Sequence, residues 1–209
     1  MEARVTKLEQ TRFQSYTIDD CIRRARLDVE RKELYSSVWK WVPPDYYDWP
    51  LEQRAECLGA KSTQLLCKSL LMENKHSDGT DPRTHPKFVL VVIQYEATLD
   101  VRKLANAIRS LKPVNERLDY SQFDFRVADA ADNDRLTGYS FNSVTPFGLI
   151  EMVPIILSEA VVPYLFFWMG GGNVHLKLGM AVSDFRKATK AMVADISQPR
   201  YSGDEDKFD

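Results

Sequence analysis

The chain contains 209 residues, of which 44% are hydrophobic and 28% are charged. This length and composition predict one globular domain with appended segments, and they leave little room for two complete domains. The formal net charge is -2 at pH 7 and the isoelectric point is near 6.0, which argues against a general electrostatic attraction to nucleic acid. A local basic patch is still compatible with this balance, for example one formed by Arg102, Lys103, Arg109 and Lys112.

The cysteine spacing and the N-terminus narrow the class of protein further. Cys21, Cys57 and Cys67 have no Cys-x-x-Cys spacing and no histidine at ligand spacing, so the sequence predicts neither a disulfide framework nor a zinc site. The N-terminus is charged from its second residue, and the longest apolar runs of about ten residues are too short to span a bilayer. We therefore expect a soluble, cytoplasmic protein without a metal ion, a cofactor or a membrane partner.

The first 45 residues predict a helical N-terminal extension. Apolar residues are spaced among charges over residues 1–30, with neither proline nor glycine, which indicates one or two helices. Such an extension either packs on the domain or docks a partner. Residues 39–50 then combine three prolines with three tryptophans and two tyrosines. These aromatic side chains either pin an irregular linker onto the core or stack on the bases of a single-stranded nucleic-acid end.

Short helices and strands follow, and they predict a mixed α+β domain over residues 46–195. An acidic, disordered tail is expected over residues 196–209. Helices are expected over 51–58, closed by Gly59, over 100–111, capped by Asp100, over 125–136, and from Ser183 onward. Strands are expected over 65–72, 88–95, 153–158, 164–168 and 174–178, with a polar surface loop over 74–87.

A single lysine interrupts the apolar run of residues 65–72. If that run is a strand, Lys68 shares a face with Leu66, Leu70 and Met72, while Cys67 points to the opposite face and into the core. An ammonium group on an apolar face extends to water, pairs with a carboxylate, or faces a cavity where its charge is used. The first is the default for an unfamiliar sequence, and the third makes Lys68 a candidate site residue.

Two glycine-containing segments, residues 142–148 and 170–173, adjoin predicted strands. A missing Cβ lets a ligand approach the backbone, and free amides in such a segment form a concave site for an anion or a carbonyl. Three glycines between two strands more often form a hairpin turn. Neither segment matches Gly-x-Gly-x-x-Gly or a P-loop, which disfavours nucleotide-phosphate chemistry.

The order of these pieces is the most informative feature of the chain. A short helix ending in Leu-Gly precedes a Cys-Lys-Ser-Leu-Leu strand, a β-branched strand and a helix followed by Leu-Thr-Gly-Tyr. Then come Val-Thr-Pro-Phe-Gly-Leu, Val-Pro-Ile-Ile-Leu-Ser-Glu and Gly-Gly-Gly-Asn-Val-His-Leu. In this order, the motifs resemble the YbaK/prolyl-tRNA synthetase-associated domain family over residues 51–190. The resemblance implies a mixed-sheet, barrel-like editing domain with surrounding helices.

The resemblance also implies an activity, which is hydrolysis of the ester bond of mischarged aminoacyl-tRNA in trans. The reaction would use no metal ion and no covalent nucleophile, and the 2′-hydroxyl of the terminal adenosine would assist it. Lys68 matches the active-site lysine of the family and would act as a positioning and charge-stabilising cation. The family's Gly-x-x-x-Pro loop matches residues 142–146, with Asn142 in place of glycine. The implied substrate-binding residues are Asn142, Ser143, Val144, Thr145, Pro146, Gly170, Gly171, Gly172, Asn173 and His175.

Two functions remain open at this stage. One is a trans-editing deacylase that acts on aminoacyl-tRNA. The other is a non-catalytic module of the same fold that binds tRNA or synthetases within a multi-synthetase assembly, with the N-terminal extension as the docking element. Lys68 and the loop ending at Pro146 favour the enzyme. His175 is the weakest of the implied site residues, because a lone histidine beside a glycine segment is more often packed or exposed than catalytic.

Overall fold

The computed structural model describes residues 19–200 of the chain. The predicted N-terminal helix and acidic tail lie partly outside this range. Within it, the helices are α2 (Asp20–Arg31), α3 (Leu51–Leu58), α4 (Val101–Arg109), α5 (Ala130–Thr137) and α6 (Val182–Thr189). The strands are β1 (Val38–Trp41), β2 (Cys67–Asn74), β3 (Phe88–Gln94), β4 (Ala97–Leu99), β5 (Phe125–Val127), β6 (Ile155–Ser158), β7 (Phe166–Asn173), β8 (Leu176–Ala181), β9 (Met192–Ala194) and β10 (Ser197–Pro199).

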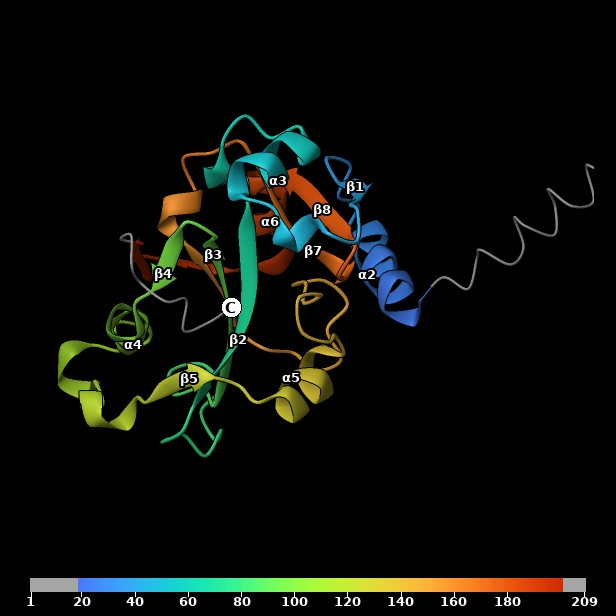
Figure 1. Cartoon of the computed structure of the whole chain (residues 1–209). Coiled ribbons are helices and arrows are strands. Elements are labelled where there is room, and N and C mark those ends of the chain that lie inside the picture. Colours follow the sequence, from blue (N-terminus) through green and yellow to red (C-terminus); the bar gives the residue numbers. More distant parts are fainter. Residues whose placement is uncertain (1–18, 201–209) are drawn as a thin grey trace, which may run out of the picture.

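The strands form three sheets (Figure 1). A five-stranded sheet has the order β5-β2-β3-β6-β9, in which β2 is antiparallel to both of its neighbours and β6 is parallel to β3 and β9. The second sheet is antiparallel, with the order β1-β8-β7, and β10 pairs with β4. A single bridge between Leu66 and Trp168 links the first two sheets. The predicted mixed α+β class is confirmed, but the described strands form open sheets rather than a closed barrel.

Strands β2 and β3 are buried on both faces. One face packs against α4, where Leu104 and Ile108 join Val91 in one core cluster. The opposite face packs against α5 through Leu90 and Leu136, and also against β7, β8 and α6. Figure 1 shows α4 and α5 on opposite sides of these two strands. Burial on both faces explains why this part of the sequence is an almost unbroken apolar run.

The neighbours Cys67 and Lys68 point to opposite faces of β2, because side chains alternate along a strand. Cys67 is only 2% exposed and lies in the cluster that contains Val92 and Phe167, as predicted. Lys68 pairs with Ile93, whose side chain lies on the α4 side. Lys68 therefore lies at the start of β2, on the face opposite to Cys67.

Several elements have the local signals that predicted them. Helix α3 ends at Gly59, which adopts the left-handed conformation with φ of 72°. The side chain of Asp100 caps α4 by accepting hydrogen bonds from the amides of Arg102 and Lys103. The segment between β2 and β3 is irregular, as expected for the polar residues 74–87.

Other predictions of the sequence were wrong. The segment 125–136 is strand β5 followed by α5, because Asp129 caps α5 by accepting from the amide of Asp132. Strand β7 continues through the glycines that were expected to form a turn, with a register shift between Gly170 and Asn173. The predicted disordered tail begins with strand β10, which pairs with β4, while residues 201–209 lie outside the described range.

The segment expected to be a helical extension is also built into the fold. Residues 38–41 are not helical but form β1, an edge strand paired with β8. Helix α2 packs beside β7, and the guanidinium of Arg24 donates to the carbonyls of Gly138 and Gly148, each over 2.6 Å. The division of the chain at residue 45 stays a prediction, and α2 and β1 both make contacts across it.

Candidate active site

Lys68 is buried beside an aromatic ring. The residue is 6% exposed, and its Nζ lies 5.8 Å from the centre of the Tyr95 ring, within the range of a cation–π contact. The default expectation that this lysine extends along the sheet to water is contradicted by its burial. Lys68 therefore places an amino group inside the protein, where its charge acts at lower dielectric than in water.

A second buried lysine, Lys177 on β8, lies beside the rings of Tyr46 and Tyr47. It is 5% exposed, and its Nζ donates to the hydroxyl oxygen of Tyr47 over 2.6 Å and to the carbonyl of Val174 over 3.0 Å. The Nζ also lies 4.3 Å from the centre of the Tyr47 ring. Burial, together with repulsion from the guanidinium of Arg54, lowers the pKa of Lys177 to about 7. Near neutral pH, Lys177 is thus poised between its ammonium and amine forms.

Arg54 on α3 is the third cation at this site. Its guanidinium donates to the carbonyls of Trp49 and Tyr47 over 2.8 and 2.5 Å. It also lies between 5.4 and 5.8 Å from the ring centres of Tyr46, Tyr47 and Tyr95. Burial raises the pKa of Tyr46 and Tyr95 well above the usual value, so both phenols stay neutral. The residues around the site therefore offer positive charge and neutral hydroxyl groups.

A small hollow with about 10 Å³ of accessible space, enough for a single water, opens beside Tyr46, Tyr95 and Lys177. The apolar part of its wall comes from Leu58, Leu66 and Met169, and Gly170 adds an uncovered stretch of backbone. The polar and aromatic part comes from Tyr46, Tyr95, Trp168 and Lys177, and Cys67 also lines the hollow. Lys68 is not among the lining residues and adjoins them through its contact with Tyr95. Apolar walls with a few polar groups are typical of sites for small ligands, but the accessible space here holds only a water, so a larger group enters only if the surrounding side chains move.

The two glycine-containing segments predicted to share a site lie against each other. The amide of Gly172 donates to the carbonyl of Ser143 over 3.1 Å. A Cβ added to Gly170 would stand 2.4 Å from the carbonyl oxygen of Val144, a distance that real Cβ atoms do not show. The 142–146 loop can approach β7 this closely only because residue 170 is glycine. The structure thus brings the loop and β7 together beside the hollow.

These contacts change the expected role of the glycines. The sequence predicted that their amides would be free for a ligand, but the amide of Gly172 already binds the loop. A Cβ on Gly172 would lie 3.1 Å from the Tyr139 ring and 3.2 Å from the carbonyl of Cys21. A Cβ on Gly171 would lie 2.9 Å from the carbonyl of Leu176. Close packing of the backbone accounts for all three glycines of β7.

Asn142 begins the loop in the left-handed conformation. Its φ is 62°, in the left-handed region that asparagine tolerates better than most residues. The side chain is exposed, and the carbonyl accepts a hydrogen bond from the Tyr47 hydroxyl over 3.1 Å. Asn142 therefore holds a backbone conformation that glycine adopts readily.

The remaining predicted site residues are distributed around this core of contacts. The Thr145 hydroxyl is buried and has no hydrogen-bond partner among the described residues, whereas Pro146 lines a separate hollow against α2. The Asn173 amide donates to Asp19 over 3.1 Å. His175 contributes backbone contacts, with its carbonyl accepting from the amide of Val42 over 2.8 Å. The structure does not place these four side chains together.

Lys177, Arg54 and Tyr47 are the site residues that the sequence did not identify. Lys177 carries the same signal as Lys68, because it interrupts the apolar strand sequence Leu-Lys-Leu. No local sequence pattern identifies Arg54 and Tyr47, because tertiary packing brings α3 and the turn before it to the site. The aromatic segment 39–50 does serve to pin the chain onto the core, with Tyr46 4% exposed in a cluster that includes Trp168.

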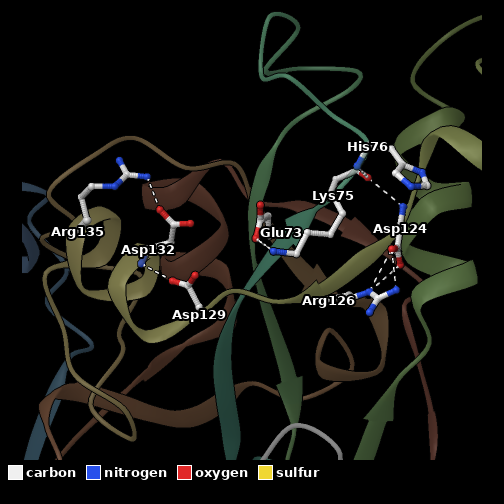
Figure 2. Close-up of polar contacts among 9 residues, drawn as sticks. Glu73, Lys75, His76, Asp124, Arg126, Asp129, Asp132 and Arg135 are labelled. Atoms are coloured by element: carbon white, nitrogen blue, oxygen red, sulfur yellow. Dashed lines mark hydrogen bonds and ion pairs between the residues drawn. The ribbon is translucent and has the colours of Figure 1, made fainter.

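A second charged cluster lies at the other end of β2 and consists of ion pairs and caps (Figure 2). Glu73 pairs with Lys75, Asp124 with Arg126, and Asp132 with Arg135. The described residues include no group of three or more His, Cys, Asp or Glu side chains placed to bind a metal ion. Among residues 19–200, no helix is both long and apolar enough to cross a bilayer. The candidate active site is the cluster around Lys68 and Lys177, which rests on the buried cations and their aromatic neighbours.

Comparison with known proteins agrees with the motif order. A family model described as an aminoacyl-tRNA editing domain matches residues 50–188. A crystal structure presented as a candidate trans-editing enzyme for prolyl-tRNA synthetase aligns with 87% of this chain and 99% of its own, at 19% identity and a TM-score of 0.68. A chain from a study of epitope grafting onto scaffold proteins aligns with 88% and 100%, at 19% identity and a TM-score of 0.67. The resemblance and the fold class are both confirmed.

Proposed function

We propose, on the premise that this chain belongs to the aminoacyl-tRNA editing domain family, that it hydrolyses the ester bond of mischarged aminoacyl-tRNA in trans. The observation that carries the proposal is the burial of Lys68 at the start of β2, at the position that the motif resemblance assigns to the family's active-site lysine. The lining of the nearby hollow supports it, because apolar side chains beside Lys177 and the Gly170 backbone suit an amino-acid side chain once the walls move to admit it.

The chemistry of the site suits ester hydrolysis. The reaction needs a positioned water, stabilisation of the negative charge that develops on the carbonyl oxygen, and help for the departing ribose oxygen. Lys68 would stabilise that charge from a buried position. Burial raises the pKa of the Cys67 thiol, so this cysteine stays protonated and is a poor nucleophile. We assign the help for the leaving group to the 2′-hydroxyl of the terminal adenosine, in a reaction without a metal ion.

The loop of residues 142–146 is the proposed wall for the amino acid. Its support is the contact of Ser143 and Val144 with β7, which places the loop next to Gly170 at the hollow. Thr145 adds a buried hydroxyl without a partner among the described residues, an arrangement that is costly unless a polar group or a water satisfies it. The motif resemblance alone supports the proposed substrate-binding roles of Pro146, Asn173 and His175.

A panel of mischarged tRNAs tests the activity. The panel includes alanyl- and cysteinyl-tRNA for proline, each labelled in the amino acid. The protein is expected to release the label faster than buffer does, and to do so equally in the presence of EDTA. A terminal adenosine without its 2′-hydroxyl should be hydrolysed more slowly. If no member of the panel is hydrolysed above the buffer rate, the proposed activity is wrong.

We also propose the cytoplasm as the compartment and synthetases as partners of the N-terminal segment. The three cysteines are free, as a reducing compartment requires. Because α2 and β1 pack into the fold, the docking role falls to the residues that precede α2. Deleting residues 1–18 should abolish co-purification with synthetases and leave thermal unfolding unchanged. Undiminished co-purification of the truncated protein would argue against this partner.

A further inference from the structure

Two consecutive hydrogen bonds join Lys177 to the 142–146 loop. The Lys177 Nζ donates to the Tyr47 hydroxyl oxygen over 2.6 Å, and that hydroxyl donates to the Asn142 carbonyl over 3.1 Å. The Val174 carbonyl accepts a further hydrogen bond from Nζ, so the amino group is held from two sides. Strand β8, the turn before α3 and the loop are far apart in the sequence, and these contacts connect them at the edge of the hollow.

The exposed end of the loop depends on this connection. At its inner end, the loop is fixed to β7 by the Ser143 carbonyl and by the close approach of Val144 to Gly170. At its outer end, Asn142 is exposed and in the left-handed conformation, and its carbonyl is bound by Tyr47. Loss of that bond would leave the first residue of the loop held by fewer contacts than the rest.

We propose that Lys177 is a positioning residue of the editing site, which through Tyr47 holds the Asn142 end of the loop in the arrangement that binds the aminoacyl group. This inference rests on the proposed function, and it adds a residue that lies outside the matched loop and the three glycines. Lys177 acts on the loop through Tyr47, so its role is distinct from the charge stabilisation assigned to Lys68.

The protonation state of Lys177 decides where the single proton of the Tyr47 hydroxyl goes. The Tyr47 side chain also shares a hydrogen bond with Tyr95, whose raised pKa keeps it a protonated donor. An ammonium group only donates hydrogen bonds, so the Tyr47 oxygen accepts from Lys177 and from Tyr95, and its own proton is directed to Asn142. A neutral amine has a lone pair that competes for the same proton. The tether of the loop is therefore strongest when Lys177 is charged, and it weakens as the pH rises through neutrality.

Other charged and titratable groups surround Lys177. Arg54 faces it from α3, and Lys40 is its half-buried cross-strand partner on β1. Tyr46 and Tyr95 are phenols with raised pKa values. Lys68 lies beside Tyr95, and the half-buried His175 precedes Lys177 in the turn before β8. Lys177 is the amine bound to the Tyr47 hydroxyl, so the geometry assigns it the switching role.

Steady-state hydrolysis by three variants tests the inference. Tyr47→Phe removes the hydroxyl, Lys177→Met removes the amino group, and Lys187→Met is the matched control, since Lys187 is exposed on α6. The first two variants should raise KM at pH 6.5 by about fivefold, the change expected for loss of one ordinary hydrogen bond. The wild type should show a fall in kcat/KM between pH 6.5 and 8.5, and these two variants should lose that fall. The control should match the wild type in both respects.

Hydrogen exchange of the loop amides separates this inference from the proposed function. The amides of residues 142–145, corrected for intrinsic exchange, should be better protected in the wild type at pH 6.5 than at 8.5, and the two variants should exchange as fast as the wild type at 8.5. This pattern would support the positioning role even if the wild type hydrolyses nothing. Equal, pH-independent protection in wild type and Tyr47→Phe would overturn it even if the enzyme is active.

Discussion

The buried amino group of Lys177 makes the stability of the fold depend on pH. Its pKa is about 7 in the folded protein, against 10.5 for an ordinary solvated lysine such as the unfolded chain presents. Between these values the unfolded chain binds more protons, so the free energy of unfolding rises with pH. At 1.36 kcal/mol per pKa unit, this group contributes about 3 kcal/mol of added stability between pH 6.5 and 9.5.

Urea denaturation of the wild type and Lys177→Met at both pH values measures this contribution. The difference between the two proteins isolates Lys177, because the phenols and Cys21 titrate alike in both. Lys177→Met should be the more stable of the two at pH 6.5, since methionine fills a similar volume without a charge to bury. That advantage should shrink by about 3 kcal/mol at pH 9.5. A difference between the proteins that is constant with pH would refute the buried, low-pKa assignment of Lys177.

Two glycine-related substitutions probe the loop geometry. Gly170→Ala places a Cβ 2.4 Å from the Val144 carbonyl. Urea denaturation should show a free energy of unfolding that is lower by about 1–3 kcal/mol, and deacylation kinetics should show a raised KM. An unchanged KM would place the loop outside the site. Asn142→Gly should leave the free energy of unfolding and KM unchanged. Asn142→Ala should lower the free energy of unfolding by about 1 kcal/mol, because φ is 62° at this position. Equal stabilities of the two variants would show that the left-handed conformation is not retained.

The parts of the structure that the sequence predicted are those with local causes. Gly59 ends α3 and Asp100 caps α4 through contacts within a few residues. Lys68 was identified because it is a charged residue among the apolar residues of a predicted strand. The close approach of Gly170 to Val144 could not be predicted, because it joins residues from separate segments through tertiary packing.

The candidate site shows the same division. Its lysine and its loop were identified from motifs, but the cluster that connects them depends on long-range packing. Strand β1 pairs with β8, which lies far from it in the sequence. This pairing brings the turn that contains Tyr47 into contact with Lys177. Propensity alone favoured an irregular linker there, since prolines and aromatics dominate that segment.

The central claim is that Lys68 serves hydrolysis of an aminoacyl ester. The most direct measurement is single-turnover deacylation of the panel substrate that the wild type hydrolyses fastest, with enzyme in excess over tRNA. Lys61 provides the matched control, because it is exposed on the turn before β2. Lys68→Ala should lose about tenfold or more of the hydrolysis rate, since it removes the cation that stabilises the developing charge, while Lys61→Ala keeps the wild-type rate. A folded Lys68→Ala protein with the wild-type rate would contradict the account.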